Sequence, residues 1–189
     1  MVSARTPRHY VYVSIGSNLA PEQHVARALR ELAQRFGEVL VLPIVKTEPC
    51  DIHSEHAFFN TLVIFAARES AETIKEWFNQ LEAEHGRDRN DPLRSQKDRT
   101  LDLDILHISP ELSMATMSAF DEPYTQVCIE ALTSPQNTQH ITLGNLQLGH
   151  RPATVYTNDG SSHVFIIEDT LDRLLQRFET TLHREQGLA

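Results

Sequence analysis

The chain has 189 residues, and its 17 Lys and Arg against 26 Asp and Glu give a formal net charge of −9 at pH 7. This acidic balance disfavours a globally basic nucleic-acid binder, and the length favours one domain rather than several. Hydrophobic residues make up 40% and charged residues 23%, which is typical of a soluble globular protein with a core. We therefore expect a single domain over residues 1–189.

No segment has the pattern of a membrane helix or a secretory signal. The longest nearly apolar run, residues 39–45, is far shorter than the roughly 20 residues of a membrane helix and contains a proline. The first 19 residues lack the apolar region of a signal peptide. Cys50 and Cys128 are too few for a disulfide framework, so we expect reduced thiols. These observations predict a cytoplasmic protein with no membrane partner.

The first predicted elements are a strand and a helix. Residues 10–15 are β-branched and aromatic and end at a Gly-Ser-Asn turn, which is typical of a strand. Pro21 is suited to the first position of a helix, and the apolar residues after it recur at helical spacing. Gly37 then ends the run, so the pattern predicts a helix over residues 21–36.

Two apolar runs follow, at residues 38–47 and 58–67, and predict strands joined by a polar loop. Pro43 favours a bulge or an edge position in the first of them. A second helix is expected after Ser70, because serine is a common N-cap. Its apolar residues recur at helical spacing as far as Gly86.

The charged loop at residues 86–99 precedes an alternating run at residues 101–108, which predicts a strand. The order to this point is βαββαβ, as in ferredoxin-like folds with one antiparallel sheet and two helices on one face. Residues 124–132 fit either a short helix or a strand. Residues 163–168 predict a strand, and residues 169–185 predict a capped helix with an apolar stripe. We expect an α+β ferredoxin-like sheet with a C-terminal strand and helix.

Two aspartates alternate with apolar residues in the strand after the charged loop. Asp102 and Asp104 are two residues apart, so their carboxylates leave the same face of a strand. Neighbouring carboxylates repel, and Mg²⁺ ions bridged by phosphate oxygens relieve that repulsion. An acidic outer face with no ligand is the alternative. The metal interpretation requires carboxylates that no neighbouring lysine or arginine seals.

Basic residues cluster in the loop just before the aspartates, at Arg87, Arg89, Arg94, Lys97 and Arg99. Such a cluster is usually a solvated loop. Beside a metal-binding carboxylate pair, its arginines would offer bidentate donors to the phosphates of a nucleotide. No P-loop motif is present, so a nucleotide would be held in another way. The combined pattern favours metal-assisted phosphoryl transfer.

Five motifs then carry a family resemblance. They are S-I-G-S-N-L at residues 14–19, T-x-P at 47–49, F-x-N at 58–60, L-E-x-x-x-G-R-x-R at 81–89 and R-T-L-D-L-D-I-L at 99–106. Through these motifs, in this order, the chain resembles the 6-hydroxymethyl-7,8-dihydropterin pyrophosphokinases. The resemblance covers about residues 9–108 and leaves residues 109–189 as a divergent C-terminal portion of one pyrophosphokinase-like domain.

The resemblance implies transfer of a pyrophosphoryl group from ATP to the hydroxymethyl group of the pterin in folate biosynthesis, which gives the pterin diphosphate and AMP. It implies that Asp102 and Asp104 coordinate two Mg²⁺ ions shared with ATP and also contact the pterin. The implied catalytic arginines are Arg87, Arg89 and Arg99. They also join the implied ATP site with Asn79, Glu82 and Tyr124. The implied pterin site comprises Thr47, Pro49, Phe58 and Asn60. One metal or a nearby Asp, Asp104 as our choice, would assist deprotonation of the alcohol.

The chain departs from the family's pattern in two places. Residues 96–99 are Gln-Lys-Asp-Arg where the family has a tryptophan followed by Gly-Pro before the arginine. After the aspartates, the family's His, Arg and Phe have no certain counterparts, and Tyr124 substitutes only in part. A second hypothesis is therefore a catalytically weak or inactive paralogue that binds nucleotide or pterin, or acts in regulation. A third, an RNA-binding sheet of the same strand order, is disfavoured by the acidic charge.

Two further patterns have structural alternatives. Cys50, His53 and His56 form a C-x-x-H-x-x-H stretch with ligand types suited to Zn²⁺, for which loop polarity is the favoured explanation. The apolar stripe at residues 171–182 is interpreted as core packing, although an exposed stripe would mediate a dimer. We expect ATP and a small pterin as partners, no nucleic acid, and a monomer or weak homodimer.

Overall fold

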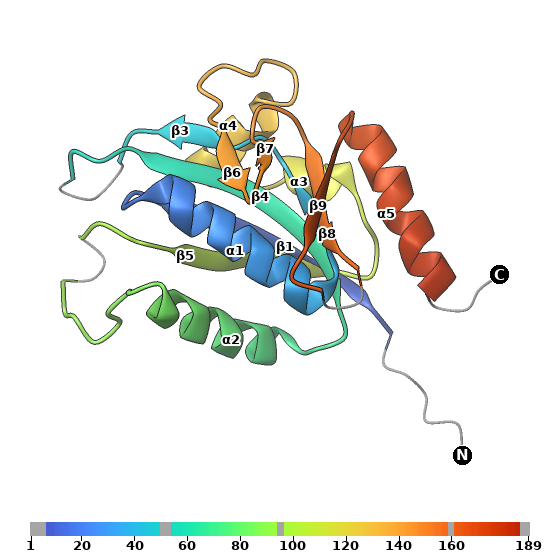
Figure 1. Cartoon of the computed structure of the whole chain (residues 1–189), viewed down its shortest axis with the longest axis horizontal. Helices are drawn as coiled ribbons and strands as arrows, with labels where there is room; N and C mark the ends of the chain where they lie inside the picture. Colours follow the sequence, from blue (N-terminus) through green and yellow to red (C-terminus); the bar gives the residue numbers. More distant parts are fainter. Residues whose placement is uncertain (1–6, 50–53, 94–96, 159–160, 186–189) are drawn as a thin grey trace.

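A computed structural model describes residues 7–49, 54–93, 97–158 and 161–185 (Figure 1). Its elements, in chain order, are β1 (His9–Ser17), α1 (Pro21–Phe36), β2 (Glu38–Val41), β3 (Val45–Thr47), β4 (Phe58–Ala67), α2 (Ala71–Glu84), β5 (Asp102–Ser109), α3 (Met114–Ser118), α4 (Pro123–Glu130), β6 (Ile141–Leu143), β7 (Leu146–Leu148), β8 (Ala153–Thr157), β9 (Val164–Glu168) and α5 (Leu171–Glu185). No helix in the described ranges is long and apolar enough to cross a membrane.

The main sheet has the strand order β5-β1-β4-β2-β8-β9, and β3 also pairs with β4. All of these pairs are antiparallel. The strands β1, β2, β4 and β5, with α1 and α2 between them in the chain, reproduce the βαββαβ order of a ferredoxin-like fold. The predicted fold class is therefore confirmed. A separate two-stranded hairpin is formed by β6 and β7.

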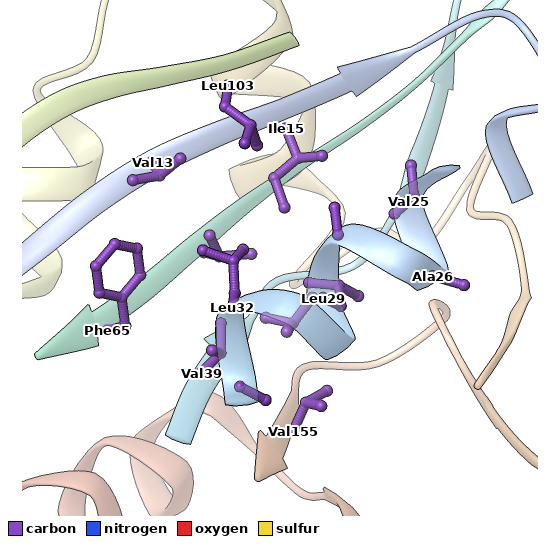
Figure 2. Close-up of a cluster of buried hydrophobic side chains, with 14 of the residues drawn as sticks. Val13, Ile15, Val25, Ala26, Leu29, Leu32, Val39, Phe65, Leu103 and Val155 are labelled. Atoms are coloured by element: carbon purple, nitrogen blue, oxygen red, sulfur yellow. The ribbon is translucent and has the colours of Figure 1, made fainter. Parts of the chain in front are cut away.

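Local sequence signals account for both helices of this core. Pro21 begins α1, and the N–H of Gly37, at φ 87°, donates to the carbonyl of Ala33 to end it. The hydroxyl of Ser70 accepts a hydrogen bond from the N–H of Thr73 and caps α2. The apolar side of α1 packs on the sheet, where Val25 and Leu29 meet side chains from several strands (Figure 2).

The strand predicted at residues 38–47 is divided in two. Both β2 and β3 pair with β4, but residues 42–44 between them belong to neither strand. Pro43 lies in this break, because proline has no N–H to contribute to a ladder. The hydroxyl of Thr61 compensates in part by donating to the carbonyl of Leu42 at 2.9 Å.

The C-terminal portion adds more structure than the sequence pattern indicates. Residues 124–132, left open between helix and strand, form most of α4, which begins at Pro123. The predicted C-terminal strand and helix are present as β9 and α5, while β8, the β6–β7 hairpin and α3 were not predicted. Through β8, which pairs with β2, this portion extends the main sheet.

Helices cover both faces of the sheet. One core lies between the sheet and α1 and α2, as predicted, and a second lies between the sheet and α3, α4 and α5 (Figure 1). Leu171, Leu174 and Phe178 of α5 are buried, which confirms core packing for that part of its stripe. Leu182 lies outside the side chains that the structure describes.

Candidate active site

Asp102 and Asp104 leave the same face of β5, as their spacing predicts. They pair in register with Gly16 and Ser14 of β1. Leu103, between them, is buried on the opposite face in the core shared with α1 and α2. Because β5 is the outermost strand of the sheet, both carboxylates lie at its edge.

Each aspartate has a cationic partner. Arg99 Nη1 lies 2.6 Å from Oδ2 of Asp102, and Arg87 Nη1 donates to its Oδ1. Lys75 Nζ lies 3.2 Å from Oδ1 of Asp104, whose side chain is 53% exposed. Arginines thus contact both oxygens of Asp102, whereas the carboxylate of Asp104 is half-exposed beside a lysine. The arginines supply positive charge that offsets the repulsion between the two carboxylates.

Glu82 of α2 connects Arg87 and Arg89 to the strand that carries the aspartates. Its side chain is fully buried. Oε1 accepts a hydrogen bond from the N–H of Leu103 at 2.8 Å, and Oε2 accepts one from Nε of Arg89 at 3.0 Å and lies 3.2 Å from Nη1 of Arg87. A buried carboxylate is stable only when it is paired and hydrogen-bonded in this way. Glu82 therefore holds two of the predicted catalytic arginines.

Asn18, at the end of the first strand, ties two loops to the site. Its Oδ1 accepts a hydrogen bond from the N–H of Arg99 at 2.6 Å, and its Nδ2 donates to Oδ1 of Asp98 at 2.8 Å and to the carbonyl of His56 at 3.3 Å. The carbonyl of Arg99 in turn accepts from the N–H of Asn18 at 3.0 Å. Asn18 is 3% exposed. The main chain of Arg99 is thus held on both sides.

A second contact joins the same two loops. Nδ1 of His56 lies 2.8 Å from Oδ2 of Asp98. A hydrogen bond from Ser54 and those from His56 and Asn18 outweigh desolvation and hold the pKa of Asp98 below its usual value. His56 is therefore engaged with a carboxylate. Cys50 and His53, the other members of the considered zinc motif, lie outside the described residues, as does Arg94 of the basic cluster.

Three of the predicted pterin residues lie together on the same sheet face as the aspartates. Phe58 and Asn60 belong to β4, and Thr47 belongs to β3, opposite Phe58. Asn60 Nδ2 donates to Oγ1 of Thr47 at 2.6 Å. Pro49 is half-buried two residues beyond the end of β3.

Gly16 of β1 lies between Asn60 and Asp102 in the sheet. In the sheet it is paired with Asn60 on one side and with Asp102 on the other. A Cβ at this position would lie 3.0 Å from Oδ1 of Asn60 and 4.0 Å from Cβ of Asp102. The absent side chain therefore lets the amide of Asn60 lie close to the backbone of β1, beside Asp102.

Tyr124 of α4 lies over the same face. Burial, together with the negative charges of Glu122, Asp104 and Asp102, raises the pKa of its phenol, while a hydrogen bond with Ser14 acts in the opposite direction. Its phenol thus lies near both aspartates. Beneath, Sγ of Cys128 lies 3.6 Å from the carbonyl of Asn60, and burial raises the pKa of this thiol to about 12. Cys128 is a free cysteine, as predicted.

Several buried polar atoms around the site lack a hydrogen-bond partner among the described residues. They are Oδ1 of Asn79, Nε of Arg87, Nε of Arg99 and Oγ1 of Thr100. Buried polar atoms are normally satisfied by protein, water or a ligand. Two of these atoms belong to the side chains of Arg87 and Arg99, which contact Asp102, and this fits a site that a polar ligand completes.

The donor set fits Mg²⁺ that arrives with phosphates. Within the described ranges, no group of three or more His, Cys, Asp or Glu residues is arranged to hold a metal ion alone. Magnesium in phosphoryl-transfer sites typically takes one or two carboxylates and completes its shell with water and substrate phosphates. Asp102 and Asp104 offer two such carboxylates for a magnesium ion that is also bound by phosphate.

Comparison with known proteins decides the family. The sequence pattern described as 7,8-dihydro-6-hydroxymethylpterin-pyrophosphokinase (HPPK) matches residues 12–142. The chain belongs to the HPPK family. This match extends into β6 and so includes α3 and α4, beyond the residues 9–108 that the motifs covered.

Two relatives come from Porphyromonas gingivalis, strains ATCC 33277 and W83. Each is named 2-amino-4-hydroxy-6-hydroxymethyldihydropteridine pyrophosphokinase and is 34% identical over 98 residues, which is 51% of this chain and 67% of the relative. As an HPPK, the chain transfers a pyrophosphoryl group in folate biosynthesis, with ATP as the co-substrate. The predicted family and activity are therefore confirmed.

Proposed function

We propose that this HPPK binds the triphosphate of ATP, with Mg²⁺, at Asp102 and Asp104, and binds hydroxymethyldihydropterin beside them against Phe58 and Asn60. The observation that carries the proposal is the shared sheet face. An aromatic side chain, an amide, a bare glycine and two carboxylates follow one another across three adjacent strands of this face.

The chemistry of each half supports this division. The Phe58 ring offers an apolar surface to a flat heterocycle, and the amide of Asn60, oriented by its bond to Thr47, offers polar contacts to the edge of that heterocycle. Gly16 leaves room for the ring between Asn60 and Asp102. The pterin would thus lie with its hydroxymethyl group toward the carboxylates.

The second half is suited to a polyphosphate. Bound Mg²⁺ would neutralise phosphate charge as a Lewis acid. Arg87 and Arg99, which pair with Asp102 in the free protein, would transfer their donors to phosphate oxygens, since guanidinium groups bind phosphate and carboxylate with the same geometry. Arg89, which pairs with the same Glu82 carboxylate as Arg87, would add positive charge beside the phosphates. Asn79, with an unpartnered buried oxygen, and Tyr124 are the proposed further ATP contacts.

In the proposed reaction, the hydroxymethyl oxygen attacks the β-phosphorus of ATP, the bond between that phosphorus and the bridging oxygen to the α-phosphate breaks, and AMP leaves. Asp104 is the proposed acceptor of the hydroxyl proton. Its side chain is 53% exposed and contacts a single lysine, whereas both oxygens of Asp102 accept from arginines. The chain otherwise contributes positioning and charge neutralisation.

The test uses isosteric variants. Asp102→Asn and Asp104→Asn should each lower kcat for AMP formation from ATP and hydroxymethyldihydropterin by more than about 100-fold, with the native circular dichroism spectrum retained. Asp102→Asn also loses its ion pairs with Arg87 and Arg99, so its thermal midpoint should fall. Asp172→Asn, on the distant helix α5, is the matched control and should behave as the wild type. Active aspartate variants would show the assignment to be wrong.

A separate measurement examines the metal. Because Arg87 and Arg99 pair with Asp102, titration calorimetry should detect little Mg²⁺ binding without nucleotide and clear binding with α,β-methylene-ATP, whose scissile bond is blocked. If the wild type binds ATP or pterin and forms no AMP, the paralogue that only binds its ligands is the correct description. Equal Mg²⁺ binding by the wild type and both aspartate variants would exclude the proposed metal ligands.

A further inference from the structure

A partly buried chain of hydrogen bonds links α1 to the end of α2, through residues that no family motif specifies. Nδ1 of His24 lies 2.8 Å from Nδ1 of His85, and Nε2 of His85 lies 2.9 Å from Oε2 of Glu31. The other carboxylate oxygen of Glu31 accepts from Nε of Arg27 at 2.9 Å. The side chain of His85 is fully buried.

The two histidines can carry one positive charge between them. An ionised Glu31 only accepts, so Nε2 of His85 must carry hydrogen. Only one proton fits between the two Nδ1 atoms, and it belongs to His24 or to His85. If both rings were charged, two N–H groups would face each other and the contact would break.

His85 stands where the chain turns from α2 toward the catalytic arginines. It is the C-terminal cap of α2, and Gly86, at φ 91°, follows it directly. The N–H of Arg87 then donates to the carbonyl of Glu82 at 3.0 Å. A displacement of His85 would therefore change the direction in which Arg87 leaves the helix toward Asp102.

We infer that His85, held by His24 and Glu31, is a positioning residue for Arg87, and that this hold is lost when both histidines become protonated. The inference rests on the proposed function, because it concerns an arginine assigned to ATP. His85 contacts His24 and Glu31 rather than the aspartates, so it acts only through the loop that it anchors.

The surrounding charges fit this description. Burial, followed by the charges of His85 and Arg27, lowers the pKa of His24, so the second protonation is displaced toward acid. Burial acts to raise the pKa of Glu31, but the hydrogen bonds and charges of His85 and Arg27 outweigh it and lower that pKa. The charged groups on the elements around His85 are His24, Arg27 and Glu31 of α1, Glu82 and Glu84 of α2, and Arg87 after it.

The experiment compares pH profiles of KM for ATP and kcat in the full-length enzyme with Mg²⁺. In the wild type, KM for ATP should rise on the acid side while kcat for bound ATP changes less. His24→Ala removes one of the two charges, so it should abolish the acid-side rise, and loss of the contact with His85 should raise KM for ATP at every pH. His85→Gln retains an amide donor to Glu31 without a titrating ring and should abolish the rise. His85→Ala should raise KM for ATP about tenfold at every pH.

Two controls separate this inference from the proposed function. His163→Ala, at an exposed histidine before β9, should match the wild type. Histidine ring NMR on the wild type should show His24 and His85 titrating as a coupled pair, whatever the activity. Independent titration of the two rings, or an unchanged KM for ATP in His85→Ala at a lowered thermal midpoint, would overturn the inference. Absence of AMP formation with coupled rings would instead count against the proposed function.

Discussion

The carboxylate of Glu82 accepts a 2.8 Å hydrogen bond from the main-chain N–H of Leu103, the residue between Asp102 and Asp104. The same carboxylate pairs with Arg87 and Arg89. One buried side chain of α2 thus fixes the strand that carries the acidic groups and the arginines that neutralise them. The relative position of anions and cations in the site is determined before any ligand arrives.

Glu82→Gln tests this arrangement. The amide oxygen can still accept from Leu103, but the negative charge opposite two arginines is lost. We expect the free energy of unfolding to fall by about 3 kcal/mol, the lower end for a broken buried pair, because Arg89 is partly exposed. kcat/KM for ATP should fall about 100-fold. Chemical denaturation and initial-rate assays measure the two effects. Glu76→Gln, on the exposed side of α2, is the control and should change neither quantity.

Gly16→Ala tests whether the pterin binds over the backbone of Gly16, beside Asn60. The added methyl would lie 3.0 Å from Oδ1 of Asn60, so KM for the pterin should rise about tenfold while KM for ATP is unchanged. Gly37→Ala is the matched control. Its methyl meets nothing within 4 Å, and the positive φ of 87° should lower the thermal midpoint without any effect on KM. An unaltered pterin KM in Gly16→Ala would place the substrate elsewhere.

Asn18→Ala releases the main chain of Arg99. Loss of the 2.6 Å acceptor for its N–H leaves a largely buried donor unpaired, which costs about 1–3 kcal/mol of stability. Because Arg99 then loses its fixed direction toward Asp102, kcat should fall about 100-fold. Thermal denaturation and single-turnover kinetics separate the two effects. Asn145→Ala, in the exposed β6–β7 turn, serves as the control. Full turnover in Asn18→Ala would show that Arg99 needs no such support.

The lowered pKa of Asp98 predicts a pH dependence of stability. A carboxyl whose pKa is lower in the folded state binds fewer protons there than in the unfolded chain. Its contribution is therefore fully present above the unfolded pKa, near 3.8, and is lost as the pH falls through the folded value. Asp98→Asn should flatten this part of the profile of thermal midpoint against pH, recorded from about pH 2 to pH 7. Parallel profiles for variant and wild type would contradict the assignment.

The fold could be predicted where local signals were strong. The bounds of α1 and β4 match their patterns because Pro21 and Gly37 limit the first and polar segments limit the second. The strands β6 and β7 have three residues each, too few for a period to emerge, and β8 was missed although β9, of the same length, was predicted. Their pairing depends on contacts with β2 and with each other, which a local pattern does not contain.

In the site, too, the local arrangement of residues could be predicted from the sequence, whereas contacts between distant segments could not. The period of two in a strand predicts that Asp102 and Asp104 share a face. The partners of these aspartates depend on where α2 ends beside β5, so the arginine pairs and the burial of Glu82 could not be read from spacing. The signal for Asn18 was its amide at the end of an apolar strand, but its contacts join loops far apart in the sequence.

Lys75 and Glu82 also affect hydrogen bonding at the edge strand β5. Both outward main-chain groups of Leu103 are taken, the N–H by Glu82 and the carbonyl by Lys75 Nζ at 3.0 Å. A strand from a neighbouring molecule would find no free ladder at this point of β5. The contacts that position the two aspartates therefore also block edge-to-edge pairing of β5 with a strand of another molecule at Leu103.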